Sequence, residues 1–139
     1  MTEKLESLEQ KRESLYKELH QVGDFRRGII SFNYRKCGKK NCACAQKGHL
    51  GHPQYLWNST IKGKSYAKSI KTGPELQKYM AEIENHDRFK QLCKEIIEVN
   101  EQICNLRPVA EMDNISELQE LKKNLKRYFM KRYKKKLRG

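Results

Sequence analysis

The first residues of the chain show the apolar spacing of an amphipathic helix. Leucine or valine recurs at the a and d positions of a heptad, with charged residues between and an arginine at one a position: Leu5, Leu8, Arg12, Leu15, Leu19 and Val22. We expect a helix over residues 2–22 that ends at Gly23. An isolated helix of this length is marginal in water, so its apolar stripe should pack on another helix, of this chain or of a second copy.

After Gly28 the spacing changes to the alternation of a strand. Ile30, Phe32 and Tyr34 alternate with polar residues and lead into a cysteine-rich loop. The segments 54–60 and 64–71 are rich in aromatic and β-branched residues and flank Lys62-Gly63, which we interpret as a tight turn. Together these segments predict a small three-stranded antiparallel sheet.

Two long helices are expected after the sheet. Thr72-Gly73-Pro74-Glu75 combines a small polar cap, a proline in the first turn and a glutamate three residues after the threonine, which is typical of a helix start. This helix should continue to about Leu106, because Arg107-Pro108 stops it. A short linker then leads to a last helix from about Asn114.

These elements predict an α+β fold with an N-terminal helix, a three-stranded antiparallel sheet carrying a Cys/His loop of zinc-finger type, and two long helices. The expected segments are a coiled-coil-like helix over 1–24, a basic sheet with the Cys/His loop over 25–72, a long packing helix over 73–107 and a basic helix over 108–139.

Composition suggests a thin hydrophobic core. Hydrophobic residues make up 37% of the 139 residues and charged residues 34%, against about 45–50% and about 25% in typical domains. We therefore expect an elongated molecule and a homodimer formed through its helices. The residues assigned to packing or dimer contacts are Leu5, Leu8, Leu15, Leu19, Ile96 and Ile103.

The net charge of +13 is concentrated in two segments. Residues 25–74 contain eleven basic and no acidic side chains, and residues 122–139 contain ten and none. The rest of the chain is net acidic. A surface that serves solubility alone usually mixes both signs, so the two basic segments are candidate surfaces for a polyanion.

The candidate nucleic-acid contacts are the basic side chains of both segments. Aromatic residues interleave with the first group, where they form either the core of the sheet or a surface for stacking bases. The assigned contacts are Arg26, Arg27, Arg35, Lys36, Lys39, Lys40, Lys62, Lys64, Lys68, Lys122, Lys123, Lys126, Arg127, Lys131, Arg132, Lys134 and Lys135.

Three of the five cysteines lie within eight positions, in the pattern Cys37-x4-Cys42-x-Cys44. With His49 or His52 as the fourth ligand they predict a Cys3His zinc site that stabilises a sheet with little core. Two alternatives stay open, a loop of reduced thiols that holds without metal and a reactive thiolate activated by nearby lysines. The remaining two cysteines, eleven residues apart in the predicted long helix, are expected in the core.

The sequence assembles no active site. Residues 25–74 lack any carboxylate that could act as a general acid or base. We therefore expect a protein without enzymatic activity. No apolar run exceeds four residues, so we expect neither a membrane span nor a signal peptide, and a cytoplasmic protein.

The middle of the chain contains a distinctive combination of motifs. It begins with Arg35-Lys36-Cys37-Gly38-Lys39-Lys40-Asn41-Cys42-Ala43-Cys44 and continues with Gly51-His52-Pro53-Gln54-Tyr55. A strand–Lys-Gly-Lys–strand hairpin and a long helix follow. This combination resembles an uncharacterised family of small bacterial and phage proteins with a C-G-K-x-N-C-x-C core, often found in mobile elements. The resemblance covers about residues 25–105. It implies a helix–sheet–helix fold and a link to recombination or defence systems.

The function expected from these features is that of a nucleic-acid-binding accessory protein. It would bind the backbone of DNA or RNA and assist a larger enzyme, such as a transposase, a recombinase or an RNA-guided nuclease of the CRISPR type. The alternative is a protein–protein scaffold that dimerises and binds a partner nuclease without contacting the nucleic acid directly.

Overall fold

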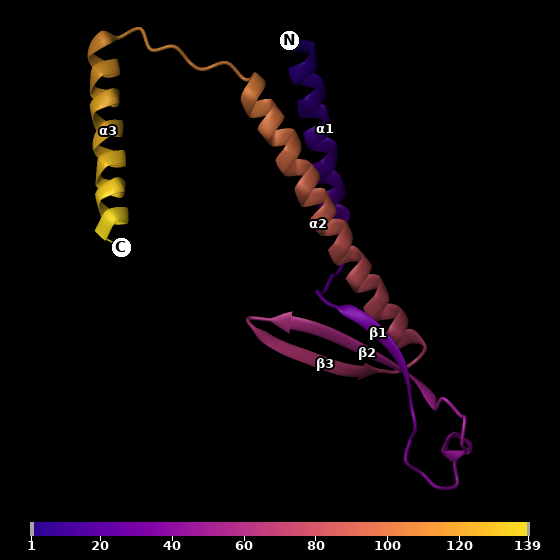
Figure 1. Ribbon diagram of the computed structural model, residues 1–139. Helices are drawn as coiled ribbons and strands as arrows, with labels where there is room; N and C mark the ends of the chain where they lie inside the picture. The colour runs from indigo at the N-terminus through magenta and orange to yellow at the C-terminus, as the bar shows by residue number, and fades with distance from the viewer. Residues whose placement is uncertain (1, 139) are drawn as a thin grey trace. The chain divides into compact units, whose positions relative to one another are not determined.

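The computed structural model describes residues 2–138 and shows the expected α+β class (Figure 1). The elements follow in the order α1 (Thr2–Gln21), β1 (Ile29–Arg35), a short 3-10 turn η1 (Ala43–Ala45), β2 (His52–Ile61), β3 (Lys64–Ile70), α2 (Pro74–Leu106) and α3 (Ile115–Arg138). The chain divides into two compact units after Leu106. Within the described part, no helix combines the length and apolarity needed to cross a membrane.

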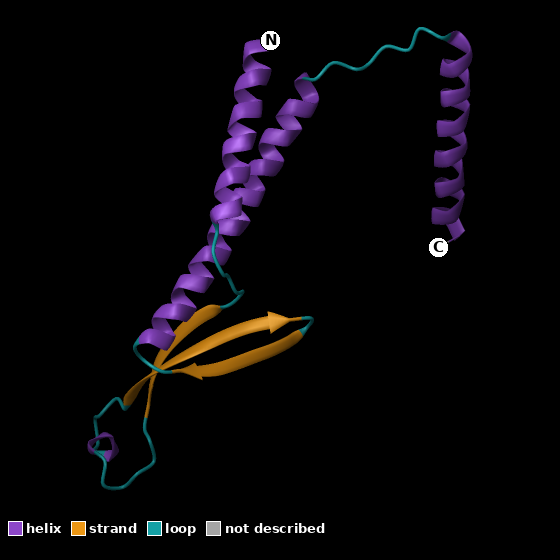
Figure 2. Ribbon diagram, turned by 180° about the vertical axis from the view of Figure 1, so that it is seen from behind, coloured by secondary structure: helices purple, strands orange, loops and turns teal. Residues whose placement is uncertain are grey.

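In the first unit, α1 and α2 form an antiparallel helical pair (Figures 1 and 2). Nearly all of the apolar stripe of α1 faces α2, so α1 packs on a helix of its own chain. The packing residues assigned from the sequence all take part in this contact. The buried residues are Leu15, Leu92, Ile96, Val99 and Ile103, and Leu5, Leu8, Leu19 and Val22 pack against them.

A polar layer crosses this helical pair. Arg12, the charged residue in the heptad stripe, donates a hydrogen bond from Nη1 to Asn100 Oδ1 at 3.0 Å. Asn100 Nδ2 in turn donates to the Ile96 carbonyl at 2.8 Å. A partly buried polar contact of this kind favours one register of the two helices, because a slip separates its partners.

The sheet has the strand order β1-β2-β3, with both pairs antiparallel. Lys62 and Gly63 connect β2 to β3 with φ values of 52° and 79°. Positive φ at both central residues matches the right-handed twist of a two-residue hairpin, as expected for Lys-Gly. At the other end of the sheet Arg35 pairs with His52, so β2 begins two residues earlier than the pattern around Pro53 predicted.

The first turns of α2 are anchored on the sheet by a cluster of aromatic and charged side chains. The buried Tyr79 ring meets Trp57 edge-on, with ring centroids 5.9 Å apart. The Arg26 guanidinium lies 3.7 Å from the Tyr79 ring centroid and pairs with Glu82 at 2.9 Å. Lys68 Nζ donates to Tyr79 Oη at 3.1 Å, which lowers the pKa of Tyr79.

The second unit contains α3, which begins where the sequence indicated. Asn114 caps it, since its Oδ1 accepts a hydrogen bond from the Glu117 N–H at 3.1 Å. None of the described side chains of α3 is buried. Its apolar side chains therefore remain open to solvent, and Phe129 and Tyr133 are 61% and 59% exposed.

Candidate metal centre and basic surface

The candidate metal centre lies in the loop between β1 and β2, which projects from the end of the sheet (Figure 2). Cys37 follows the last residue of β1 by two positions, and His52 is the first residue of β2. Because Arg35 pairs directly with His52, the two strand ends hold Cys37 and His52 close together. The turn η1 brings Cys42 and Cys44 back to them.

The four side chains lie close enough together to hold one metal ion. Their ligand atoms all lie within 4.8 Å of one another. Cys37 Sγ and Cys44 Sγ are 3.5 Å apart, and Cys42 Sγ lies 3.2 Å from His52 Nε2. A tetrahedral zinc ion with ordinary bond lengths separates its ligand atoms by roughly 3.5–3.8 Å. The cluster could therefore bind a metal ion with little rearrangement.

The structure places His52, and not His49, with the thiols. His49 Nδ1 accepts a hydrogen bond from the Gly51 N–H at 2.9 Å, within the loop. It lies outside the metal-binding group among the described residues. The sequence alone left this choice open, because it depends on the strand register that puts His52 opposite Arg35.

Backbone amides of the loop point at two of the sulfurs. The Lys39 N–H lowers the pKa of the Cys37 thiol, with a further contribution from the Cys44 side chain. The Cys44 N–H does the same for Cys42, together with the Cys44 and His52 side chains. These hydrogen bonds favour the thiolate, which is the form of cysteine that ligates metals.

Cys44 is the buried member of the cluster, with 1% of its surface exposed. Its Sγ accepts a hydrogen bond from the Cys37 N–H at 3.5 Å, which lowers its pKa. Burial and the neighbouring thiols outweigh this effect, so the pKa of Cys44 is raised overall. A divalent cation would reverse that balance, because its charge stabilises all three thiolates at once.

Gly51 closes the loop against the end of β1. Its φ is +105°, and a Cβ built there would lie 2.6 Å from the carbonyl carbon of Arg35 and 2.8 Å from Lys36 N. The contact is between backbones, so the loop reaches the strand only because this position has no side chain. The sequence alone did not indicate this contact.

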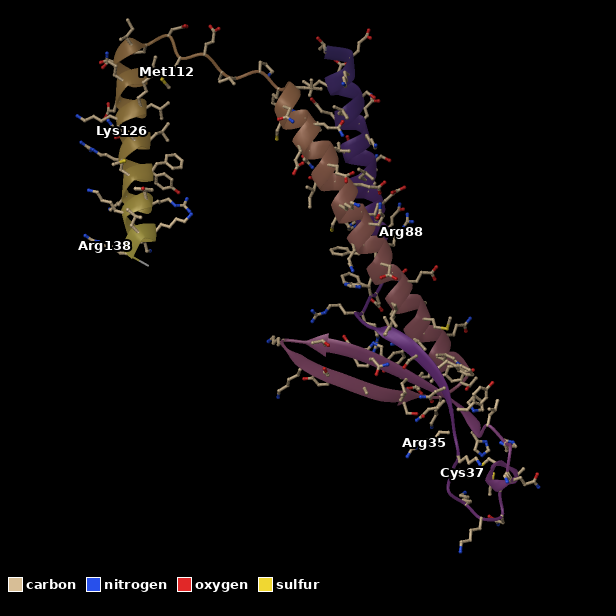
Figure 3. All side chains as sticks on the ribbon, viewed as in Figure 1. Arg35, Cys37, Arg88, Met112, Lys126 and Arg138 are labelled. Atoms are coloured by element: carbon tan, nitrogen blue, oxygen red, sulfur yellow. The ribbon has the colours of Figure 1, made fainter. Side chains whose placement is uncertain are left out.

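In the first unit nearly all of the assigned basic side chains are exposed. They lie around the loop of residues 36–51, called the metal loop below, and at the β2–β3 hairpin. Figure 3 shows Arg35 beside Cys37 at the loop end of the sheet. Two assigned residues have partners within the chain. Arg26 is partly buried and pairs with Glu82, and Lys68 bonds to Tyr79 and lies 3.8 Å from Glu75.

In the second unit the assigned basic side chains are all exposed on α3, where Figure 3 labels Lys126 and Arg138. The members of this group are Lys122, Lys123, Lys126, Arg127, Lys131, Arg132, Lys134 and Lys135. Arg132 Nη1 donates to Tyr128 Oη at 2.9 Å, one turn earlier in the same helix.

The cysteines of α2 lie outside the cluster. Cys93 is half-buried, as a packing residue would be, whereas Cys104 is exposed. The expectation that both belong to the core is wrong for Cys104. It is next to Ile103, which faces α1 and is buried, and neighbouring residues on a helix point in directions about 100° apart.

Comparison with known proteins gives one family match. No curated protein and no solved structure matches the chain. Residues 3–78 match the family described as "Domain of unknown function (DUF6788)". The match covers α1, the sheet with its cysteine loop and the first residues of α2, so it begins earlier and ends earlier than the resemblance drawn from the motif. Because the match spans more than half of the chain, this protein belongs to the DUF6788 family.

Proposed function

We propose that this protein is a non-enzymatic nucleic-acid-binding accessory protein that assists a larger nucleic-acid enzyme. The observation that carries the proposal is the separation of charge. Two segments, 25–74 and 122–139, carry eleven and ten basic residues and no acid. In both segments the structure exposes most of these side chains. Such a surface attracts phosphates and releases their counterions on binding.

The acids that approach the basic sheet support this proposal, because each is already paired. Glu75 lies 3.8 Å from Lys68 Nζ. Glu82 accepts from Lys78 at 2.8 Å and from Arg26 at 2.9 Å, and these contacts, that of Lys78 first, lower its pKa. The carboxylates at the junction of helix and sheet therefore compensate Lys68, Lys78 and Arg26, and the hairpin cations Lys62 and Lys64 form no ion pair among the described residues.

The metal in this proposal is zinc. Three thiolates and one imidazole form a common structural zinc site, and soft sulfur ligands exclude magnesium and calcium. Zinc would fix the loop that carries Lys36, Lys39 and Lys40 and so hold these cations in a defined array. Its role is structural, because the four protein ligands leave no open coordination position.

The zinc site is tested with a matched pair of histidine variants. We expect His52→Asn to weaken metal binding at least about tenfold, since it removes one of four ligands. His49→Asn should leave affinity unchanged, because His49 lies outside the cluster. Competition with a chromophoric chelator measures zinc affinity, and the visible spectrum of the cobalt-substituted protein reports sulfur ligation. Equal loss in the two variants would contradict the assignment of His52.

Nucleic-acid binding is tested by fluorescence anisotropy with duplex DNA, single-stranded DNA and RNA over a salt series. Binding should weaken steeply with salt, with a slope of about 0.9 for each phosphate contact on a duplex. Lys62→Glu and Lys64→Glu should lower both affinity and slope. Lys11→Glu, on the net acidic α1 segment, is the control. Weak binding of the intact protein to all three probes near physiological salt would refute the proposal.

The proposal still includes a homodimer, but its contacts would come from exposed side chains of the helical pair and not from the apolar stripe of α1. Since α1 uses most of its apolar stripe on α2, the helical pair offers exposed side chains such as Ile97 and Tyr16, at 56% and 48% exposure. Sedimentation of the intact protein should give twice the monomer mass. A monomer at all concentrations would remove this part of the proposal without affecting nucleic-acid binding.

A second candidate function is a scaffold that binds a partner nuclease. The exposed apolar residues of α3 favour it, because a helix with Leu125, Phe129 and Tyr133 at 47–61% exposure buries these side chains when it meets a partner. The surrounding lysines and arginines disfavour pairing of α3 with a second α3. Removal of residues after Leu121 separates the two functions, since a scaffold loses its partner while the sheet still binds nucleic acid.

A further inference from the structure

Three aromatic side chains form a continuous cluster on one face of the sheet. Phe32 lies in the middle, with its ring centroid 5.1 Å from that of Tyr34 and 5.2 Å from that of Tyr55. Phe32 pairs with Tyr55 across β1 and β2, and Tyr34 pairs with Pro53 one step nearer the metal loop. Side chains of paired residues share a face of the sheet, so the rings form one surface.

Part of this aromatic cluster remains exposed to solvent in the folded chain. On the same face, Trp57 is covered by Tyr79 of α2. Two residues along β2, Tyr55 is half-buried. Phe32 and Tyr34, farther from α2 on this face, remain 52% and 48% exposed. Contiguous exposed apolar surface of this kind usually marks a binding site.

The charges around the cluster indicate the ligand. Lys36 follows Tyr34 closely in the chain, the loop beyond it carries Lys39 and Lys40, and all three are exposed. Surfaces for protein partners usually carry charges of both signs at the rim, whereas residues 25–74 contain no acidic side chain. Flat rings bordered by cations alone match a polyanion that has aromatic groups of its own.

We infer that Phe32, Tyr34 and Tyr55 form a stacking platform for the bases of a single-stranded nucleic acid, with the lysines of the metal loop on its phosphates. This inference rests on the proposed function and names its substrate class. The bases of a duplex are stacked inside the helix and cannot lie on these rings. A duplex would therefore reach the protein through its phosphates alone, and the platform favours single strands.

The test compares four probes on the full, metal-loaded chain. They are short oligothymidylate and oligouridylate, the same DNA strand with abasic sugars in place of its central nucleotides, and a duplex. Stacking contributes enough that loss of one aromatic contact weakens binding roughly 5- to 150-fold. We expect the abasic strand to bind the unaltered protein more weakly by a factor in this range, with an unchanged salt slope, because all its phosphates remain.

Phe32→Leu and Tyr34→Leu should produce a similar loss for the intact strand while leaving duplex binding unchanged. Tyr66→Leu is the matched control, since Tyr66 is a 46% exposed tyrosine that pairs with Ser59, four positions along β2 from Tyr55. The fluorescence of Trp57 on β2 shows whether each variant keeps the sheet.

The outcomes separate this inference from the proposed function. Equal binding of abasic and intact strands would overturn the platform and leave phosphate binding in place. An equal loss toward duplex and single strand in the Phe32 and Tyr34 variants would overturn it too. If the unaltered protein binds neither kind of probe near physiological salt, both proposals fail. The abasic comparison needs no variant, so it decides the question even if the substitutions disturb folding.

Discussion

Gly51→Ala should damage the metal loop more than any other glycine substitution in it. Gly51 precedes β2, and its backbone rests on the end of β1. The contact sets how closely Cys37 approaches His52, because Gly51 directly precedes His52 in the Arg35–His52 pair and Cys37 follows Arg35 by two positions. A methyl group at position 51 would therefore act on the site through the strand ends, without touching a ligand.

The magnitude follows from two separate costs. The backbone at position 51 has a φ of +105°, and this conformation costs an L residue such as alanine about 1–2 kcal/mol. The new Cβ would also lie 2.6 Å from the Arg35 carbonyl carbon and 2.8 Å from its oxygen. Backbone atoms cannot rotate away as a side chain can, and overpacking of this kind costs about 1–3 kcal/mol. The total expected loss of stability is about 2–5 kcal/mol.

Gly48→Ala provides the matched control. Gly48 has a similar φ of +91°, but no atom lies within 4 Å of the place that its methyl group would take, so it carries the conformational cost alone. Urea unfolding followed by Trp57 fluorescence measures both variants, with and without zinc. Gly51→Ala should lower the free energy of unfolding by about 1–3 kcal/mol more than Gly48→Ala, and should also weaken zinc binding. Equal effects in the two variants would refute the argument that the loop is seated on β1.

Two further predictions concern the helices. Ile96→Ala should destabilise the protein by about 2–5 kcal/mol, because Ile96 is 9% exposed in the core, whereas Met80→Ala, at 55% exposure on the same helix, should cost less than about 1 kcal/mol; thermal unfolding compares them. Ion pairs with Lys78 and Arg26 lower the pKa of Glu82 from its ordinary value of 4.5, so their stabilisation is complete above that pH and is lost as the pH falls through the lower folded value. Glu82→Gln should therefore be less stable than the unaltered protein at neutral pH, with the difference shrinking in acid, and a constant difference across pH would contradict this linkage.

Local patterns were enough to predict the elements of this fold. The heptad stripe of α1, the Lys-Gly turn and the start of α2 at Pro74 each depend on residues close together in the sequence. Their physical causes, amphipathic spacing, positive φ and a proline at the first helical position, act over a few residues. For the same reason the thiol pattern of Cys37, Cys42 and Cys44 was recognisable as a candidate ligand set.

The features that the sequence did not determine depend on contacts between distant segments. Arg26 has the same appearance in the sequence as Arg27, yet it pairs with Glu82, 56 residues away. The choice between His49 and His52 depends on strand register, and Pro53 obscured it, because proline is usually a strand breaker. Pro53 is tolerated here because β3 pairs with β2 only as far as Tyr55, so position 53 has a strand on one side.

The distribution of apolar burial gives a physical reason for a metal in the proposed binding surface. Most of the buried aliphatic side chains lie between α1 and α2, whereas the sheet contributes few buried residues, among them Ile70 and Ser59. A surface rich in lysine repels itself and gains little from the hydrophobic effect. The sheet must therefore be fixed at its ends, by Tyr79 and Arg26 at the α2 junction and by the Cys/His cluster at the loop. Fixing the sheet at these two places would leave the strand between them free to present Phe32 and the neighbouring cations to the proposed nucleic-acid ligand.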